Sequence, residues 1–445
     1  MRLFLSQRRL FALLLFTLLF LVLILKMDFS LKGDHINDKI YYALEEQNKT
    51  FYRSRDSKSN NSRNIGILTV IDETVKERDY FFALESMRCY ASLQAYDFRI
   101  EKDSATWSAL CNQTDIMFRR HCIAAHLLDD HEWTLVIDAD VGVINPSKLI
   151  EEWIDDRFDV IMYDRFYNWE VATGSYLVRR SQFGKEFLMQ FAEYEKKLPK
   201  SFHGTDNSAI HALLVDLFAP YAKQEMSDCH IIWEQSKSYS EVFQFEACVR
   251  IILGSNRHFP PKLKIVPKGE GWVRDGWLSD SLWSPETDFM LHGWQLRRLL
   301  TPFLNETRYL QFASWEAPFS RPIDQTQCQL GTSTWHYNRA LIKTRKIIEE
   351  KLETVRRKVI SHFWNTTAEI GRYFKCAIPK EDRGVFKRMP WAFRVLGYSY
   401  ADELRTSDLP GFYSWSAINE WTVLDDNYCG QRAGCFLADF VETDD

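Results

Sequence analysis

The sequence predicts an α/β protein with a central parallel or mixed β-sheet covered by helices on both faces. Short apolar runs that are typical of buried strands alternate with segments in which apolar residues recur every three or four positions. Such alternation is the pattern of sheets that have helices on both sides. The chain has 445 residues, of which 46% are hydrophobic, so it can form one large domain with appendages or two domains.

The expected elements begin with an apolar strand at residues 65–71. Asn145 followed by Pro146 is typical of a helix start, so a helix is expected after Pro146. Ser181 is expected to cap a helix that runs to about Lys197. The other early elements are expected as strands at 98–100, 135–138, 159–162 and 176–178 and as helices at 77–95 and 116–128.

The N-terminus predicts a membrane anchor. Residues 10–25 are apolar apart from Thr17 and follow Arg2, Arg8 and Arg9. A helix over this run is about 24 Å long, slightly short of a ~30 Å hydrocarbon core, and flanking apolar residues extend it. The preceding arginines favour a cytoplasmic N-terminus. We therefore expect a single-pass type II protein of the Golgi or ER membrane with its catalytic part in the lumen; a cleaved signal peptide is the alternative.

The predicted organisation has five parts. They are a cytoplasmic tail at 1–9, a signal-anchor transmembrane helix at 10–26, a polar luminal stem at 27–63, an α/β catalytic domain at 64–300, and a C-terminal extension at 301–445. The sequence does not indicate a role for the extension, but it predicts a charged helix there at 340–358.

Cysteines and glycosylation acceptors agree with a luminal position. The nine cysteines have no metal-type spacing, so several are expected to pair in an oxidising compartment. Cys229 with Cys248, and Cys429 with Cys435, are the local bridges that we expect. Asn-x-Ser/Thr acceptors occur at Asn48, Asn60, Asn112, Asn305 and Asn365.

Charge and motif content exclude several classes of function. The net charge is −5, and without strongly basic blocks the sequence does not support a nucleic-acid partner. The chain contains no Gly-x-Gly-x-x-Gly, Walker or His-Glu-x-x-His motif, which removes the commonest dinucleotide, P-loop and zinc-protease interpretations.

The most informative motif is Asp138-Ala139-Asp140, directly after the apolar run 133–137. Side chains two residues apart on a strand point to the same face. If the chain bends at Gly142, both carboxylates can converge on one divalent cation. Mg²⁺ and Mn²⁺ prefer such oxygen ligands and commonly share them with a substrate's phosphates. The alternative interpretation is two solvated carboxylates at a strand end.

Two segments between the motif and residue 220 are candidates for sugar binding. Gly174 precedes an apolar strand, so its backbone either approaches a sugar or forms a turn. A helix is expected to begin near Thr205. Its start places Asp206 and Asn207 towards a sugar, or else Thr205 or Asp206 simply caps the helix.

The strand at 288–292 ends in His292 and is followed by Gly293. A histidine here is either structural or a third ligand of the cation. In the second case, Arg297 and Arg298 are positioned to neutralise phosphate oxygens.

The order of these segments resembles a known family. Together, 65–71, 117–120, 133–146, 174–179, 206–214 and 292–293 are similar to galactosyl/mannosyl transferases of the GMA12/MNN10 type, which are retaining enzymes of GT-A fold. They are more similar still to a nematode-expanded family of glycosyltransferase-like, signal-anchored proteins of unknown function (domain of unknown function 273). The resemblance covers about residues 65–297 and implies a GT-A-like, Rossmann-like nucleotide-diphospho-sugar transferase fold.

The resemblance also implies roles for individual residues. Asp138, Asp140 and His292 would hold Mn²⁺ or Mg²⁺, and Asp206 and Asn207 would be the catalytic residues near the anomeric carbon. Asn207 stands where the transferases have glutamine. The nucleotide sugar, UDP- or GDP-linked, would contact Val70, Ile71, Asp72, Arg119, Asp138, Ala139, Asp140, Gly174, Ser175, Gly293, Trp294 and Arg297.

The resulting hypothesis is metal-dependent, retaining transfer of a hexose from a nucleotide sugar to a luminal glycan or glycoprotein. If the reaction inverts instead, Asp206 would be the base. A glycoside hydrolase is the rival enzyme, but it needs two carboxylates facing each other across a sugar. The non-enzyme alternative is a catalytically inactive, glycan-binding type II membrane protein of the same fold.

Overall fold

The computed structural model describes Lys39 and residues 41–44, 63–254, 257–259, 261–301, 315–328 and 334–377. The predicted cytoplasmic tail, the membrane helix at 10–26 and the pair Cys429 and Cys435 lie outside these residues. Within the described part of the chain, no helix has both the length and the apolar character needed to cross a membrane.

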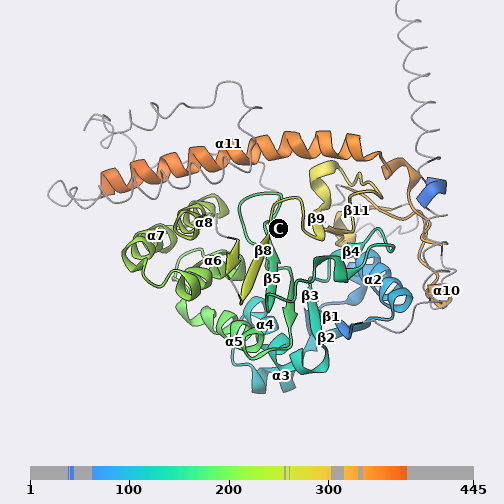
Figure 1. Ribbon diagram of the computed structural model, residues 1–445, viewed down its shortest axis with the longest axis horizontal. Coiled ribbons are helices and arrows are strands. Elements are labelled where there is room, and N and C mark those ends of the chain that lie inside the picture. The colour runs from blue at the N-terminus through green and yellow to red at the C-terminus, as the bar shows by residue number, and fades with distance from the viewer. Residues whose placement is uncertain are drawn as a thin grey trace, which may run out of the picture.

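A seven-stranded mixed sheet forms the centre of the molecule (Figure 1). Its strand order is β2-β1-β3-β6-β5-β8-β7. Strand β3 is parallel to β1 but antiparallel to β6, and β5 is antiparallel to β6 but parallel to β8. The strands are β1 (Ile65–Asp72), β2 (Asp97–Asp103), β3 (Trp133–Ile137), β5 (Val160–Tyr163), β6 (Ser175–Arg179), β7 (His258–Phe259) and β8 (Leu263–Val266). The prediction of a mixed α/β fold is confirmed.

Alternating side chains of the strands belong to two different hydrophobic cores. In β3, Leu135 and Ile137 pack into the first core, whereas Val136 between them packs into the second. Leu68 of β1 likewise lies in the second core and Ile67 in the first. Because successive side chains of a strand point to opposite faces, this division shows that both faces of the sheet are buried. The sequence therefore has continuous apolar strands here.

Helices cover both faces of the sheet (Figure 1). The first core contains residues of α2 (Phe81–Gln94), and the second contains residues of six other helices. These six are α4 (Ile116–Leu127), α5 (Gln182–Glu193), α6 (Thr205–Phe218), α7 (Lys223–Gln235), α8 (Tyr239–Leu253) and α11 (Arg345–Ala377). The short α3 (Ala105–Leu110) follows β2.

A three-stranded sheet, in the order β4-β10-β9, brings distant parts of the chain together. Its strands are β4 (Val141–Val143), β9 (Val273–Asp275) and β10 (Met290–His292). His292 pairs with Val141 on one side and with Asp275 on the other. This register places the end of the 288–292 segment beside Asp140, 152 residues earlier in the chain (292 minus 140).

The described residues between 315 and 342 pack against the first core. Phe319 and Tyr337 are buried in it, and the Tyr337 hydroxyl donates a hydrogen bond to the Ile144 carbonyl at 2.9 Å. A disulfide joins Cys89 of α2 to Cys328 at the end of α10 (Gln325–Cys328). Strands β11 (Leu299–Leu300) and β12 (Trp315–Glu316) form a small parallel pair. The long α11 (Arg345–Ala377) then crosses the whole domain and packs on α8 (Figure 1).

Several local predictions are wrong. The segment after Pro146 is a turn held by Asn145, followed only by the 3-10 turn η3 (Ile150–Trp153). Gly204, rather than Thr205 or Asp206, is the N-cap of α6. The charged helix begins at Arg345 instead of residue 340 and continues to Ala377.

Other local predictions are confirmed. Ser181 caps α5 by accepting a hydrogen bond from the backbone N–H of Gly184. The predicted Cys229–Cys248 disulfide links α7 to α8. Tyr41 and Leu44, which belong to the predicted stem, are buried in the first core.

Candidate functional site

Asp138 and Asp140 lie between the end of β3 and the start of β4, where the chain leaves the central sheet. The backbone N–H of Asp138 donates to the Gly174 carbonyl at 2.7 Å. The carbonyl of Asp140 accepts from the backbone N–H groups of Gly293 and Trp294 at 3.1 and 2.9 Å. The two aspartates are therefore held by main-chain contacts to the segments that the sequence singled out.

The side chains of Asp138, Asp140 and His292 form one cluster. Each offers one ligand atom, and these atoms all lie within 4.8 Å of one another. The side chains retain 31%, 11% and 23% of their exposure, so the cluster opens to solvent. The structure thus brings together the three residues predicted as metal ligands.

Asp275, at the end of β9, contacts the ring nitrogen of His292 that does not contact Asp140. His292 Nδ1 lies 2.8 Å from an Asp275 carboxylate oxygen, while Nε2 lies 3.3 Å from Asp140 Oδ1. Arg165 in turn binds Asp275 at 3.2 Å and Glu170 at 3.0 Å. A carboxylate behind a histidine orients the ring and raises its basicity as a metal ligand. Asp275 gave no motif in the sequence, because its place depends on the β9–β10 register.

The charges of the cluster shift the pKa values of its members. Burial acts to lower the pKa of His292, but Asp140 and Asp275 outweigh it and raise the value to about 10. Burial acts to raise the pKa of Asp140, but the charge and hydrogen bond of His292 outweigh it and lower the value. Burial raises the pKa of Asp138, against the charge of Arg120. The site therefore contains a positive charge next to Asp140, which His292 carries.

Arg120 connects the cluster to Asp206. One of its terminal nitrogens binds Asp138 and the other binds Asp206, and its side chain is only 11% exposed. Sequence reasoning chose the neighbouring Arg119, which instead binds Asp103 at 2.7 Å and the Gln113 carbonyl. The helical period could have identified Arg120, because it lies three and four residues before buried Ile123 and Ala124. Arg119 still lies close enough to Asp72 to help lower its pKa.

Asp206 is almost completely enclosed. Its side chain is 1% exposed, and the carboxylate contacts Arg120 and His121. Burial acts to raise its pKa, but these two partners outweigh burial and lower it to about 2. His121 is itself buried and contacts the Tyr176 hydroxyl at 2.6 Å. Asp206 is therefore the buried counter-ion of Arg120.

Asn207 is half-buried, unlike Asp206, and its side-chain oxygen lies 2.5 Å from the hydroxyl of Thr173. The turn that leads into this segment is strained at Thr205, which has a φ of 55°, whereas the φ of 68° at Gly204 is one that glycine adopts readily. A β-branched residue such as Thr205 rarely adopts this left-handed conformation, and such strain concentrates at functional sites. The strained turn directs Asn207 towards Thr173 and hence towards Gly174.

Gly174 makes room for the carboxylate of Asp138. A Cβ atom on this residue would lie 2.3 Å from Asp138 Oδ2. The predicted close approach at Gly174 is therefore to a protein carboxylate. The side chain of the next residue, Ser175, is fully buried and accepts a hydrogen bond from the Trp272 indole at 2.8 Å.

Ile71 packs with Ala139, and half-buried Tyr80 lies at their edge, whereas half-buried Val70 packs against a separate group that includes Cys122 and Ile123 of α4. Asp72 follows and accepts hydrogen bonds from Thr74. Burial, together with the charges of Asp140 and Asp138, raises the pKa of Tyr80, which indicates that its hydroxyl lies near the aspartates. Tyr80 was not identified from the sequence.

The residues after His292 have different surroundings. The Trp294 ring is buried and packs against Gly142. A Cβ atom on Gly142 would lie 2.1 Å from this ring. Arg297 is exposed and donates to Gln295 at 2.9 Å, and Gln295 donates to Asp140 at 3.2 Å. The charge of Arg298 contributes to lowering the pKa of Asp140. Arg297 and Arg298 thus carry positive charge to the rim of the cluster.

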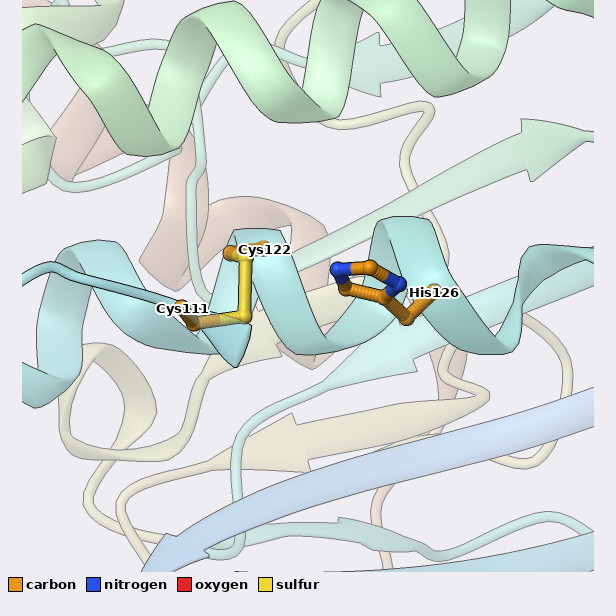
Figure 2. Close-up of side chains that lie close together, drawn as sticks. All are labelled: Cys111, Cys122 and His126. Atoms are coloured by element: carbon orange, nitrogen blue, oxygen red, sulfur yellow. A yellow bond between two sulfur atoms is a disulfide. The ribbon is translucent and has the colours of Figure 1, made fainter. Parts of the chain in front are cut away.

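Figure 2 shows a second group of potential metal ligands, Cys111, Cys122 and His126. Here the two sulfur atoms are bonded to each other in a disulfide between the end of α3 and α4. Zinc and similar metals bind cysteine as the thiolate, which a disulfide does not provide. This group is therefore a structural cross-link.

Comparisons with solved structures find glycosyltransferases at low similarity. A glycosyltransferase involved in the glycosylation of the major capsid of PBCV-1 has 15% sequence identity and a TM-score of 0.33, with 51% of this chain and 92% of that chain covered. The glycosyltransferase GlyE of Streptococcus pneumoniae TIGR4 has 16% identity and a TM-score of 0.28, with 38% of this chain and 48% of that chain covered. The chain thus spans about half of GlyE.

No curated protein matches the chain. A family model does match, over residues 87–308, and its description is "Protein of unknown function, DUF273". The matched range includes Arg120, Asp138, Asp140, Asp206 and His292. The chain therefore carries a domain of the DUF273 family, as the sequence predicts.

Proposed function

We propose that this protein is a glycosyltransferase that requires Mn²⁺ or Mg²⁺ and moves a sugar from a UDP- or GDP-linked donor to a luminal glycan or glycoprotein. The observation that carries the proposal is the convergence of Asp138, Asp140 and His292 where β3 ends. In open α/β sheets, ligands bind beyond the carboxyl ends of strands.

The three side chains fit a divalent cation. Two carboxylate oxygens and one imidazole nitrogen lie within 4.8 Å, and the buried Asp275 orients the histidine. Asp138, Asp140 and His292 would hold the ion and leave further positions for phosphate oxygens. Bound there, the cation would act as a Lewis acid that stabilises negative charge on the departing diphosphate.

The same geometry argues against a glycoside hydrolase. A hydrolase places its two carboxyl groups about 5–9.5 Å apart on opposite sides of the scissile bond. One carboxylate oxygen of Asp138 and one of Asp140 lie within 4.8 Å of each other and of a His292 nitrogen, which suits a shared cation.

The surroundings of Asp206 support transfer with retention. An inverting reaction needs a base that accepts the proton of the acceptor hydroxyl. Asp206 is enclosed by Arg120 and His121, so it is poorly placed for that role. Asn207 is half-buried and bonded to the buried Thr173, so it is more accessible than Asp206 and is the residue that we place next to the donor sugar.

The cysteines support a luminal location. Six of them form three disulfides in the described part of the chain, and disulfides persist mainly in oxidising compartments. The two acceptor asparagines in this part, Asn112 and Asn365, are both exposed. We therefore propose a type II protein of the Golgi or ER membrane, anchored by the helix predicted at 10–26.

The experiment is an assay of the full-length protein with an array of nucleotide sugars, scored for donor hydrolysis with and without Mn²⁺. We expect hydrolysis of one donor class only when Mn²⁺ is present. Asp138→Ala should abolish it, whereas Asp129→Ala, a substitution of an exposed carboxylate on η2 (Leu128–Asp130), should not.

Sugar release that needs neither metal nor nucleotide would contradict the transferase proposal. Mn²⁺-dependent binding of UDP or GDP without hydrolysis or transfer would instead indicate the inactive, glycan-binding alternative.

A further inference from the structure

Three half-buried aromatic side chains form a group beside His292, and Trp277 is the member that contacts it. The Trp277 ring centroid lies 5.3 Å from that of His292 and 5.7 Å from that of Trp315, on which it stacks. Tyr167 meets Trp277 edge to face at 6.2 Å. All three rings keep part of their surface exposed. We call Tyr167, Trp277 and Trp315 the aromatic cluster.

The backbone is shaped to hold this cluster. Gly293 has a φ of 102°, and a Cβ atom there would lie 2.9 Å from the Trp277 ring and 3.6 Å from the Trp315 ring. A side chain at position 293 would therefore displace Trp277 from His292, whereas its contact with Trp315 would be an ordinary one. This close approach is a second reason, besides the left-handed backbone, for a glycine after the histidine.

Two arginines border the cluster. The Arg165 guanidinium lies 5.7 Å from the ring centroid of Tyr167 and 5.8 Å from that of Trp277. Arg298 lies 5.5 Å from the ring centroid of Trp315. Arg165 is also tied to the buried Asp275 and is only 22% exposed, so it supports the rings from the inner side. Apolar rings and N–H donors therefore occur together at one edge of the group formed by Asp138, Asp140 and His292.

We propose that the aromatic cluster binds a pyranose ring of the acceptor glycan. A pyranose has an apolar face of C–H groups and a rim of hydroxyls, and it fits a surface of aromatic rings bordered by hydrogen-bond donors. Partly exposed aromatic groups beside a polar site are typical of binding surfaces. The proposal rests on the proposed transferase function, because only a transferase needs an acceptor here.

The position of the cluster favours the acceptor over the nucleotide base. In the sheet β4-β10-β9, Asp140 precedes β4, His292 ends β10, and Trp277 follows β9. The cluster is thus on the far side of His292 from Asp140. The end of β1, where the nucleotide is expected, lies on the side of Asp138, because β1 is the neighbour of β3.

The experiment measures two affinities on the full-length protein and its variants. One is the affinity for methyl glycosides of mannose, galactose and N-acetylglucosamine, by saturation-transfer NMR at up to about 10 mM, the range of weak binding. The other is the affinity for UDP and GDP with Mn²⁺, by calorimetry. The variants are Trp277→Ala, Trp315→Ala and the conservative Trp277→Phe, with Trp153→Ala as the control. Trp153 is also half-buried but stacks on Phe289, at the opposite end of β10.

We expect at least one glycoside to bind the wild-type protein. Trp277→Ala and Trp315→Ala should each weaken that binding about five- to tenfold, and by more than they weaken nucleotide binding. Trp277→Phe should retain most of the glycoside affinity, and Trp153→Ala should retain all of it.

Three results would overturn the proposal. The first is the absence of glycoside binding by the wild-type protein, and the second is a loss of glycoside affinity in Trp153→Ala equal to that in Trp277→Ala. The third is a loss of UDP or GDP affinity in Trp277→Ala as large as its loss of glycoside affinity, which would assign the rings to binding of the nucleotide base. Failure of the transferase proposal itself is distinguishable, because it appears as absence of Mn²⁺-dependent nucleotide binding in the wild-type protein.

Discussion

Replacing Arg120 with methionine tests the central electrostatic feature of the site. Methionine keeps most of the aliphatic packing of the arginine but removes its charge. The substitution leaves Asp206, whose side chain is 1% exposed, without its guanidinium partner, and it also frees Asp138, which is 31% exposed. Arg120→Met therefore removes one cation from two carboxylates at once.

The magnitude follows from the difference in burial between the two carboxylates. Breaking a buried ion pair by removing one partner costs about 3–5 kcal/mol, because the other charge stays buried. The Asp138 contact adds little, since solvent screens a carboxylate that is about one third exposed. We expect a loss of about 4 kcal/mol in the free energy of unfolding, roughly a thousandfold change in the unfolding equilibrium.

Urea denaturation of the full-length protein measures this loss. Lys185→Met is the control, because it removes a cation from the exposed pair with Asp129 and should leave stability nearly unchanged. The double variant Arg120→Met/Asp206→Asn should regain at least half of the loss, since it also removes the buried negative charge. The explanation is refuted if Arg120→Met is within about 1 kcal/mol of the wild type, or if the double variant is no more stable than the single one.

Three further predictions concern the metal site and the fold. Gly174→Ala should lower Mn²⁺ affinity about tenfold or more in an EPR titration, because its Cβ would lie 2.3 Å from the Asp138 carboxylate; unchanged affinity would contradict this. Since the pKa of His292 is raised to about 10, the imidazole is protonated at neutral pH and must lose its proton to bind metal. Mn²⁺ affinity should therefore rise with pH from 6 to 9, and calorimetry in two buffers should detect proton release. A pH-independent affinity would contradict this explanation. Replacing both Cys89 and Cys328 with serine opens a loop with a sequence separation of 239 and should lower stability to urea by about 5 kcal/mol, whereas a loss below about 1 kcal/mol would show that the cross-link is dispensable.

The α/β class and the place of the metal motif could be predicted because they depend on local patterns. Strand β3 is apolar on both faces, and its end is followed directly by Asp138 and Asp140. Likewise, His292 ends a short apolar strand. Periodicity and strand ends are properties of contiguous residues, so a single sequence contains them. The proposed function of the cluster remains a prediction for the experiments above.

Local reasoning failed where several structures were compatible with the same residues. Asn145 and Pro146 suit a helix start, but Asn145 holds a turn by accepting from Ser147, and its amide donates to the Pro285 carbonyl. Similarly, Asp206 has the residue type of a helix cap or a base. Its surroundings, which α4 contributes, make it a buried counter-ion instead.

The sequence by itself therefore determined the fold class, the strand-end aspartates and the third candidate ligand, since each depends on residues adjacent in the chain. The tertiary structure alone decided that Arg120 meets both Asp138 and Asp206, and that Asp275 supports His292. The physical reason is that strand order and register bring these groups together across gaps of up to 155 residues, as between Asp140 and Gln295. No local pattern encodes such contacts.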